Sequence, residues 1–215
     1  MKEDLIKAQY DVTKKSKIRI FYDSNKALII FLISTLFICS ASYIYYEDRI
    51  EKKKIVISEN YIEAKLNLEN GDKKKSLEIL KTIILENDKT YSTLSLFLIL
   101  KENLINDQVE LLKFFDHLLQ NNKFENEFKN LIIFKKALFQ SSFANEIELL
   151  NTIKPLINNE TVWKPHAFLL LGNYFVSKKQ YLKAKEFYTK ILSLKDLHRE
   201  LYMQASSLIA LIPNE

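Results

Sequence analysis

The sequence predicts an all-α protein: an N-terminal transmembrane helix, then an α-solenoid of about four helix pairs, then a C-terminal capping helix. Three observations support this fold class. Only two glycines and three prolines occur in 215 residues, too few for a fold built from many short strands and turns. Residues 27–46 contain no charged side chain. The remainder is charged and follows the period of amphipathic helices.

The apolar run 27–46, ALIIFLISTLFICSASYIYY, is long enough to cross a bilayer. About 20 apolar residues at a rise of 1.5 Å span a hydrocarbon core of roughly 30 Å. Three tyrosines close the run: Tyr43, Tyr45 and Tyr46. An apolar ring with a polar hydroxyl suits the headgroup level. The run is therefore predicted to be a transmembrane helix between a polar tail, residues 1–26, and a charged stalk, residues 47–54.

Three other interpretations of this run fit less well. A cleavable signal peptide has a shorter apolar stretch, although Ser40-Ala41-Ser42 imitates its cleavage site. A lipoprotein signal ending at Cys39 needs a small residue before the cysteine, and Ile38 stands there. A buried core helix normally keeps a polar stripe, which this run lacks.

Basic residues nearly balance across the run, so the positive-inside rule gives weak guidance on orientation. Five precede the run closely and four follow it: Lys14, Lys15, Lys17, Arg19 and Lys26, then Arg49, Lys52, Lys53 and Lys54. We expect the N-terminus in the cytoplasm and the body outside it. The basic tail is expected to contact anionic lipid headgroups.

Charge and cysteine content exclude further classes. The net charge of +5 divides into +3 for residues 1–26 and +2 for the rest. Nucleic-acid binding is not expected, because a nucleic-acid groove needs a concentrated basic face. Cys39 is the only cysteine, so no intramolecular disulfide can form and core packing must stabilise the body.

No pattern in the sequence indicates catalysis. His117, His166 and His198 are isolated, and no metal-binding spacing of histidines or cysteines occurs. The two glycines, Gly71 and Gly172, are too far apart to build a phosphate-binding loop. We therefore expect no enzyme activity, cofactor, metal ion or small-molecule substrate.

The clearest repeat unit is residues 165–195, PHAFLLLGNYFVSKKQYLKAKEFYTKILSLK, where two amphipathic helices flank a polar turn at 177–180. It resembles a tetratricopeptide repeat, a helix pair with a period of about 34 residues. Five residues match that pattern: Leu171, Gly172, Phe175, Ala184 and Tyr188. The resemblance implies that the two helix backbones approach closely at Gly172 and Ala184, where a large side chain would separate them.

Weaker units precede this one. In residues 61–87, Ala64 and Ser76 are twelve residues apart, the same separation as the small pair of the clear repeat. Asp72 is the predicted N-cap of the second helix there. Further helices are predicted over 89–103, 107–119, 124–140, 144–153 and 201–212.

Two local signals refine these helices. Asp107 and Glu110 have the spacing of a capping box at the start of a helix. Pro155 and residues 158–160 are expected to interrupt the helical pattern. The last helix has no partner, as is typical of a solenoid that needs a cap.

The order of tail, single span and weak repeats resembles a family of single-pass inner-membrane tetratricopeptide proteins of proteobacteria. The family includes the ancillary subunit of the Sec translocon and related cell-division coordinators. The likeness is specific over residues 147–195, where Trp163 precedes LLLGNYF and KAKEFY follows it. It implies a cytoplasmic tail and a periplasmic repeat domain, residues 55–215. The implied partners are the Sec translocon, membrane-anchored chaperones or emerging polypeptides.

The predicted protein-binding groove lies on the first helix of the clear repeat. First helices form most of the inner surface of a helical-repeat array. The groove candidates are His166, Leu169, Asn173 and Val176. Alternatively, Leu169 and Val176 pack on the neighbouring repeat. None of the four is basic, so we expect an apolar or extended polypeptide rather than a clamped C-terminal carboxylate.

Three functions remain open on the sequence alone. The first is a membrane-anchored interaction scaffold, an accessory factor at the Sec translocon that assists the biogenesis of secreted or membrane proteins. The second is a structural cell-envelope or division-associated protein that self-associates or organises other envelope proteins. With an inverted topology, the protein would be a cytosol-facing assembly factor.

Overall fold

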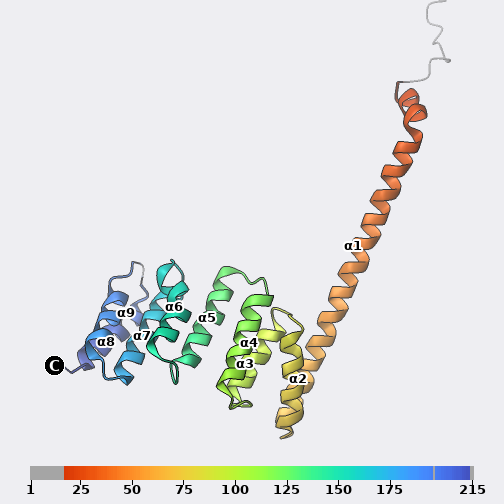
Figure 1. Cartoon of the computed structure of the whole chain (residues 1–215). Helices are drawn as coiled ribbons and strands as arrows, with labels where there is room; N and C mark the ends of the chain where they lie inside the picture. The colour runs from red at the N-terminus through yellow and green to blue at the C-terminus, as the bar shows by residue number, and fades with distance from the viewer. Residues whose placement is uncertain (1–16, 196, 214–215) are drawn as a thin grey trace, which may run out of the picture. The chain divides into compact units, whose positions relative to one another are not determined.

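The computed structural model describes residues 17–195 and 197–213, and these form helices and turns without a strand (Figure 1). The predicted all-α class is confirmed. Contacts divide the chain into two compact units between Val56 and Ile57, close to the predicted boundary between stalk and repeat domain. The first sixteen residues, including Lys14 and Lys15 of the expected basic tail, lie outside the described part.

Helix α1, Lys17–Glu69, begins before the apolar run and contains a non-helical residue, Asn25, with φ −119° and ψ 16°. The Ser24 hydroxyl and the Asn25 amide both donate to the Phe21 carbonyl, at 3.1 and 3.0 Å. Such local bonds compete with the helical ladder. The last part of the expected polar tail is therefore helical, and the helix is interrupted just before the apolar run.

Residues 27–46 lie in α1, the one described helix that is long and apolar enough to cross a membrane. None of its most apolar stretch is buried by the rest of the described chain. By length and composition this segment is a candidate membrane span near the N-terminus. The charged stalk, residues 47–54, continues in the same helix.

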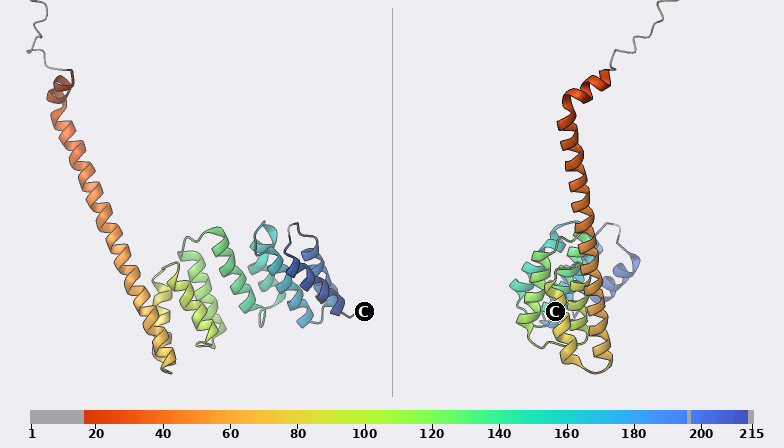
Figure 2. Two further views of the ribbon diagram at one scale, coloured as in Figure 1. Left: turned by 180° about the vertical axis from the view of Figure 1, so that it is seen from behind. Right: turned by 90° about the vertical axis from the view of Figure 1, so that its right-hand side faces the viewer.

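The second unit, residues 57–215, contains the end of α1 and the remaining described helices, which follow one another in a row (Figures 1 and 2). Their bounds are α2 Lys73–Leu85, α3 Tyr91–Lys101, α4 Gln108–Asn121, α5 Asn126–Gln140, α6 Glu146–Asn158, α7 Lys164–Ser177, α8 Tyr181–Leu192 and α9 Arg199–Leu211. In chain order the helices make four successive pairs, namely the end of α1 with α2, α3 with α4, α5 with α6 and α7 with α8, and α9 follows them. The predicted number of pairs and the C-terminal helix are confirmed in the described part. Contacts within a pair are extensive for α5 with α6 and for α7 with α8, whereas α3 packs more on α2 than on α4.

Helix starts follow the predicted caps with one correction. Asp72 and Asp107 accept hydrogen bonds from backbone amides at the starts of α2 and α4. The Glu110 carboxylate, however, pairs with Lys81 of α2 at 2.6 Å instead of returning to the cap. The reciprocal capping box occurs at the start of α6, on Asn145. Glu110 thus forms an ion pair between α4 and α2 instead of capping the start of α4.

Pro155 was predicted to interrupt the helical pattern, and this is wrong, because it lies inside α6. Proline removes one hydrogen bond of the ladder and crowds the preceding turn. Ile153 and Leu156, on either side of it, are fully buried and hold both halves of the helix against the core. The helix ends at Asn158, within the predicted break at 158–160.

Two apolar cores run through the repeat unit and meet in α5. Ile132 belongs to the core of α1 to α5, whereas its neighbour Ile133 belongs to the core of α5 to α9. The C-terminal helix α9 joins the second core through Ala205, which is fully buried. Because adjacent residues of α5 face different cores, this helix links the two halves of the repeat unit.

The predicted repeat-packing residues are all buried: Ala64, Ser76, Leu171, Gly172, Phe175, Ala184 and Tyr188. The backbone amides of Ser76 and Ala184 each donate to the carbonyl of the N-cap residue at 3.1 Å. Both therefore occupy the first turn of the second helix of a pair. This shared position explains why the twelve-residue spacing recurs in the first and fourth pairs.

Candidate protein-binding surface

The four predicted groove residues share one stripe of α7 but have different environments. Leu169 is partly buried and packs against the second core, which is the packing role that the sequence left open for it. The Tyr188 hydroxyl donates to Asn173 Oδ1 at 2.6 Å. Burial raises the pKa of Tyr188, so the hydroxyl keeps the proton that it donates. Val176 remains 37% exposed.

His166 lies in an aromatic corner between α5 and α7. Its ring centroid is 5.7 Å from that of Trp163 and 6.1 Å from that of Phe134. Trp163 Nε1 also donates to the Glu127 carbonyl at 3.2 Å. Trp163, which the sequence singled out only through a resemblance, thus fixes the start of α7 to α5.

Thr161 reinforces this junction. Its hydroxyl donates to the Glu127 carboxylate at 2.9 Å and accepts from the Asn130 amide at 3.1 Å. The loop between α6 and α7 is therefore held to the first turns of α5 by polar contacts and by stacked rings.

A hollow of about 880 Å³ lies beside that corner. Its walls come from the loop before α7, the first turn of α7, the segment between α8 and α9, and the start of α9. The apolar and aromatic side chains among them are Trp163, Pro165, His166, Leu194, Leu197 and Leu201. His166 is the predicted groove residue that lines it. The Lys164 ammonium at its edge is paired with Glu160 at 2.7 Å.

A second hollow, of about 450 Å³, lies between the first helices α3 and α5 and was not predicted. Its apolar wall consists of Leu94, Phe97, Phe124, Phe128 and Leu131. Leu94 is 41% exposed and Phe128 is 37% exposed, so apolar surface remains open to solvent. We call this hollow the α3–α5 groove.

A neighbouring hollow of about 390 Å³, which we call the extension, shares the lining residue Phe97 with the α3–α5 groove. The ammonium of Lys135, which lines this extension, lies 6.0 Å from the Phe97 ring centroid, within reach of a cation–π contact. Lysines line both hollows, at Lys89 in the groove and Lys101 in the extension, and Glu125 lines the groove. Apolar floor and basic margins together suit a polypeptide with apolar and acidic side chains.

Sequence reasoning missed the α3–α5 groove because no single motif marks it. Leu94 and Phe97 are three residues apart, as are Phe128 and Leu131, so each pair lies on one side of its helix. That spacing was a usable signal within each helix. That α3 and α5 line one hollow, although α4 lies between them in the sequence, is a tertiary fact that neither segment encodes alone.

Metal-binding side chains are dispersed in this surface. Across residues 17–195 and 197–213, no three His, Cys, Asp or Glu side chains are grouped to hold a metal ion. The α3–α5 groove and its extension combine apolar side chains with lysines, a combination that suits the binding of a polypeptide.

Comparisons with models of protein families, with curated proteins and with solved structures found no match. The likeness to tetratricopeptide repeats therefore rests on the residues of 165–195 and on the helix pairing itself.

Proposed function

We propose that this protein is a membrane-anchored interaction scaffold whose repeat domain binds polypeptide in the α3–α5 groove. The observation that carries the proposal is the partly exposed apolar wall of that groove, formed by two adjacent first helices. Ligand sites are concave and mainly apolar, with a few polar groups that orient the ligand. Contiguous exposed apolar surface on a soluble domain commonly marks an interaction site.

Binding would be driven by burial of the client's apolar side chains against Leu94, Phe97 and Phe128. Each buried methylene contributes about 0.8 kcal/mol. The ordering of an extended client opposes much of this gain, so affinity in the groove alone is modest. Anchoring offsets the low affinity, because a tethered groove has a high effective concentration for clients at the same membrane.

The proposed location is the bacterial inner membrane, crossed once by residues 27–46, with the tail in the cytoplasm and the repeats in the periplasm. There the protein would serve as an accessory factor at the Sec translocon, meeting emerging polypeptides or a membrane-anchored chaperone. The exposed apolar helix supports the anchor. The likeness of residues 147–195 to inner-membrane tetratricopeptide proteins supports the compartment and the partners.

A structural envelope role is the second candidate, and exposed apolar side chains on α9 favour it. Tyr202, Met203 and Leu211 are exposed on this last helix, Leu211 by 78%. A helical-repeat array usually ends in a polar cap. Apolar side chains at this end would suit stacking against a second copy or another envelope protein.

Site-specific photocrosslinking of the full chain in membranes separates the two candidates. A photoreactive residue would replace Leu94 in the groove, Tyr202 on α9 or Leu182 on α8, which is 82% exposed and serves as the control. Adducts with translocon subunits, chaperones or nascent chains from position 94 support the scaffold. Self-adducts from position 202 support the envelope role. Equal adducts from position 182 would show that the groove has no special part in binding.

A further inference from the structure

One side of α1 carries a continuous polar stripe just after the candidate span, and the geometry points to a binding site there for the phosphate of an anionic phospholipid. The stripe lines a shallow hollow of about 550 Å³: Tyr45, Asp48, Arg49, Lys52, Lys53 and Val56. Spacings of three and four residues place these side chains on the same side of the helix. The inference rests on the proposed membrane anchoring of residues 27–46.

The structure separates charges that nearly cancel in the sequence. Residues 47–54 hold four basic and three acidic side chains. The stripe contains three of the basic residues and only one acidic residue, Asp48. The remaining charges lie on the opposite side by helical spacing: Glu47, Glu51 and Lys54. The stripe is therefore formally +2 and the opposite side −1, so the formal charge is distributed unevenly around the helix axis.

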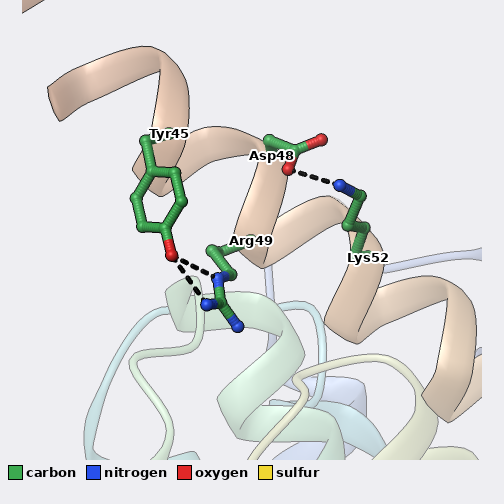
Figure 3. Close-up of polar contacts among 4 residues, drawn as sticks. All are labelled: Tyr45, Asp48, Arg49 and Lys52. Atoms are coloured by element: carbon green, nitrogen blue, oxygen red, sulfur yellow. Dashed lines mark hydrogen bonds and ion pairs between the residues drawn. The ribbon is translucent and has the colours of Figure 1, made fainter. Parts of the chain in front are cut away.

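Arg49 is the anchor of this site (Figure 3). Its Nε and Nη2 donate to the Tyr45 hydroxyl oxygen at 2.9 and 2.6 Å, and its guanidinium carbon lies 5.2 Å from the Tyr45 ring centroid. A phenol is neutral, so these bonds orient the guanidinium without cancelling its charge. Lys52, by contrast, is paired with the Asp48 carboxylate at 2.7 Å. An oriented guanidinium with further N–H donors fits the geometry of a phosphate.

The depth of Arg49 identifies the anion as a lipid phosphate. Tyr45 is the next-to-last residue of the apolar run, and Arg49 lies about 6 Å further along the helix axis. A bilayer of about 40–45 Å with a core of about 30 Å leaves a headgroup layer of some 5–8 Å on each side. Arg49 therefore falls within this layer, where phosphodiesters are concentrated, and the Tyr45 ring falls at its inner edge.

The test uses the full chain reconstituted into phosphatidylcholine vesicles that contain a trace of spin-labelled phosphatidylglycerol or spin-labelled phosphatidylcholine. The motionally restricted fraction of each label gives the preference of the protein for the anionic lipid. We expect a clear preference in the unmodified chain and a loss of about fivefold in Arg49→Gln, the effect of one basic residue near an anionic surface. Tyr45→Phe, which removes the hydroxyl that orients Arg49, should lower the preference in the same direction.

Lys54→Gln is the matched control, because it removes the same charge from the opposite side of the helix. It should lower the preference by less than about twofold, as a general charge effect screened by salt. Equal losses in Arg49→Gln and Lys54→Gln would overturn the site in favour of unspecific attraction. Absence of a preference in the unmodified chain, or an unchanged one in Arg49→Gln, would also overturn it and leave the anchor intact. A chain that fails to enter vesicles at all would refute the anchor and the site together.

Discussion

Gly172 of α7 faces the ring of Tyr188 of α8 so closely that a Cβ atom at position 172 would overlap the ring carbons. The sequence attributed the small residue to close approach of two helix backbones at Gly172 and Ala184. The structure shows instead that the space at Gly172 is filled by an aromatic side chain from the second helix of the same pair. Glycine is retained within a helix here because it admits that ring.

Gly172→Ala should therefore destabilise the repeat unit by about 2 kcal/mol, the usual cost of overpacking, even though alanine is the better helix former. Urea unfolding of a fragment that begins at residue 47, followed by circular dichroism, measures the change. In a Tyr188→Leu background the same substitution should cost clearly less, because the ring is gone. Additive costs in the double variant would contradict the proposed contact.

Lys179 ends the turn between α7 and α8 in the left-handed conformation, with φ +60°. The amide of the next residue, Gln180, donates to the Phe175 carbonyl at 2.9 Å, which closes the end of α7. A side chain in this conformation costs about 1 kcal/mol relative to glycine. Lys179→Gly should raise the free energy of unfolding by up to that amount. Lys178→Gly, at φ −88°, should bring no gain, and a gain there equal to that at position 179 would sink the explanation.

Alkaline pH should weaken the repeat unit through its buried tyrosines. Burial raises the pKa of Tyr188 above its ordinary value of 10.0. Above that value the unfolded chain loses the phenolic proton while the folded chain retains it, so stability falls as the pH rises. At pH values well below 10.0 both the folded and the unfolded chain keep the phenolic proton, so the stability that is lost at alkaline pH is fully present there.

Tyr188→Phe isolates this contribution, although burial also raises the pKa of Tyr61 and Tyr174. The variant lacks the bond to Asn173 and should be less stable by about 1 kcal/mol at neutral pH. That deficit should shrink as the pH passes 10.0. The deficit is measured from the unfolding midpoints of the unmodified chain and of Tyr188→Phe at pH values below and above 10.0. A deficit that does not change with pH would contradict the role of burial.

Phe128→Ser should weaken client binding about fivefold or more, because an aromatic anchor that the client covers carries more than about 1 kcal/mol of binding energy. Leu182→Ser removes an equally apolar side chain from α8, outside the groove, and should leave affinity unchanged. Fluorescence anisotropy of a labelled apolar peptide with acidic flanks measures both affinities. The peptide is titrated with the fragment that begins at residue 47, carrying either Phe128→Ser or Leu182→Ser. Similar affinities for the two variants would remove the α3–α5 groove as the binding site.

The parts of this fold that could be predicted from the sequence are those with local causes. Asp72 and Asp107 marked helix starts because their side chains satisfy nearby amides, and the uncharged run marked the candidate span by its length alone. Pro155 misled because its local penalty is offset by the burial of Ile153 and Leu156, which only the packed structure shows. The α3–α5 groove joins Leu94 with Phe128, residues that no local pattern relates.

Topology tests the account most directly. A reporter that is active only outside the cytoplasm, fused after Glu215 of the full chain, should give a strong signal if residues 27–46 cross the membrane with the tail inside. A reporter active only in the cytoplasm should give none at the same position. The reverse pattern would place the α3–α5 groove in the cytosol, and both the translocon scaffold and the envelope role would be wrong.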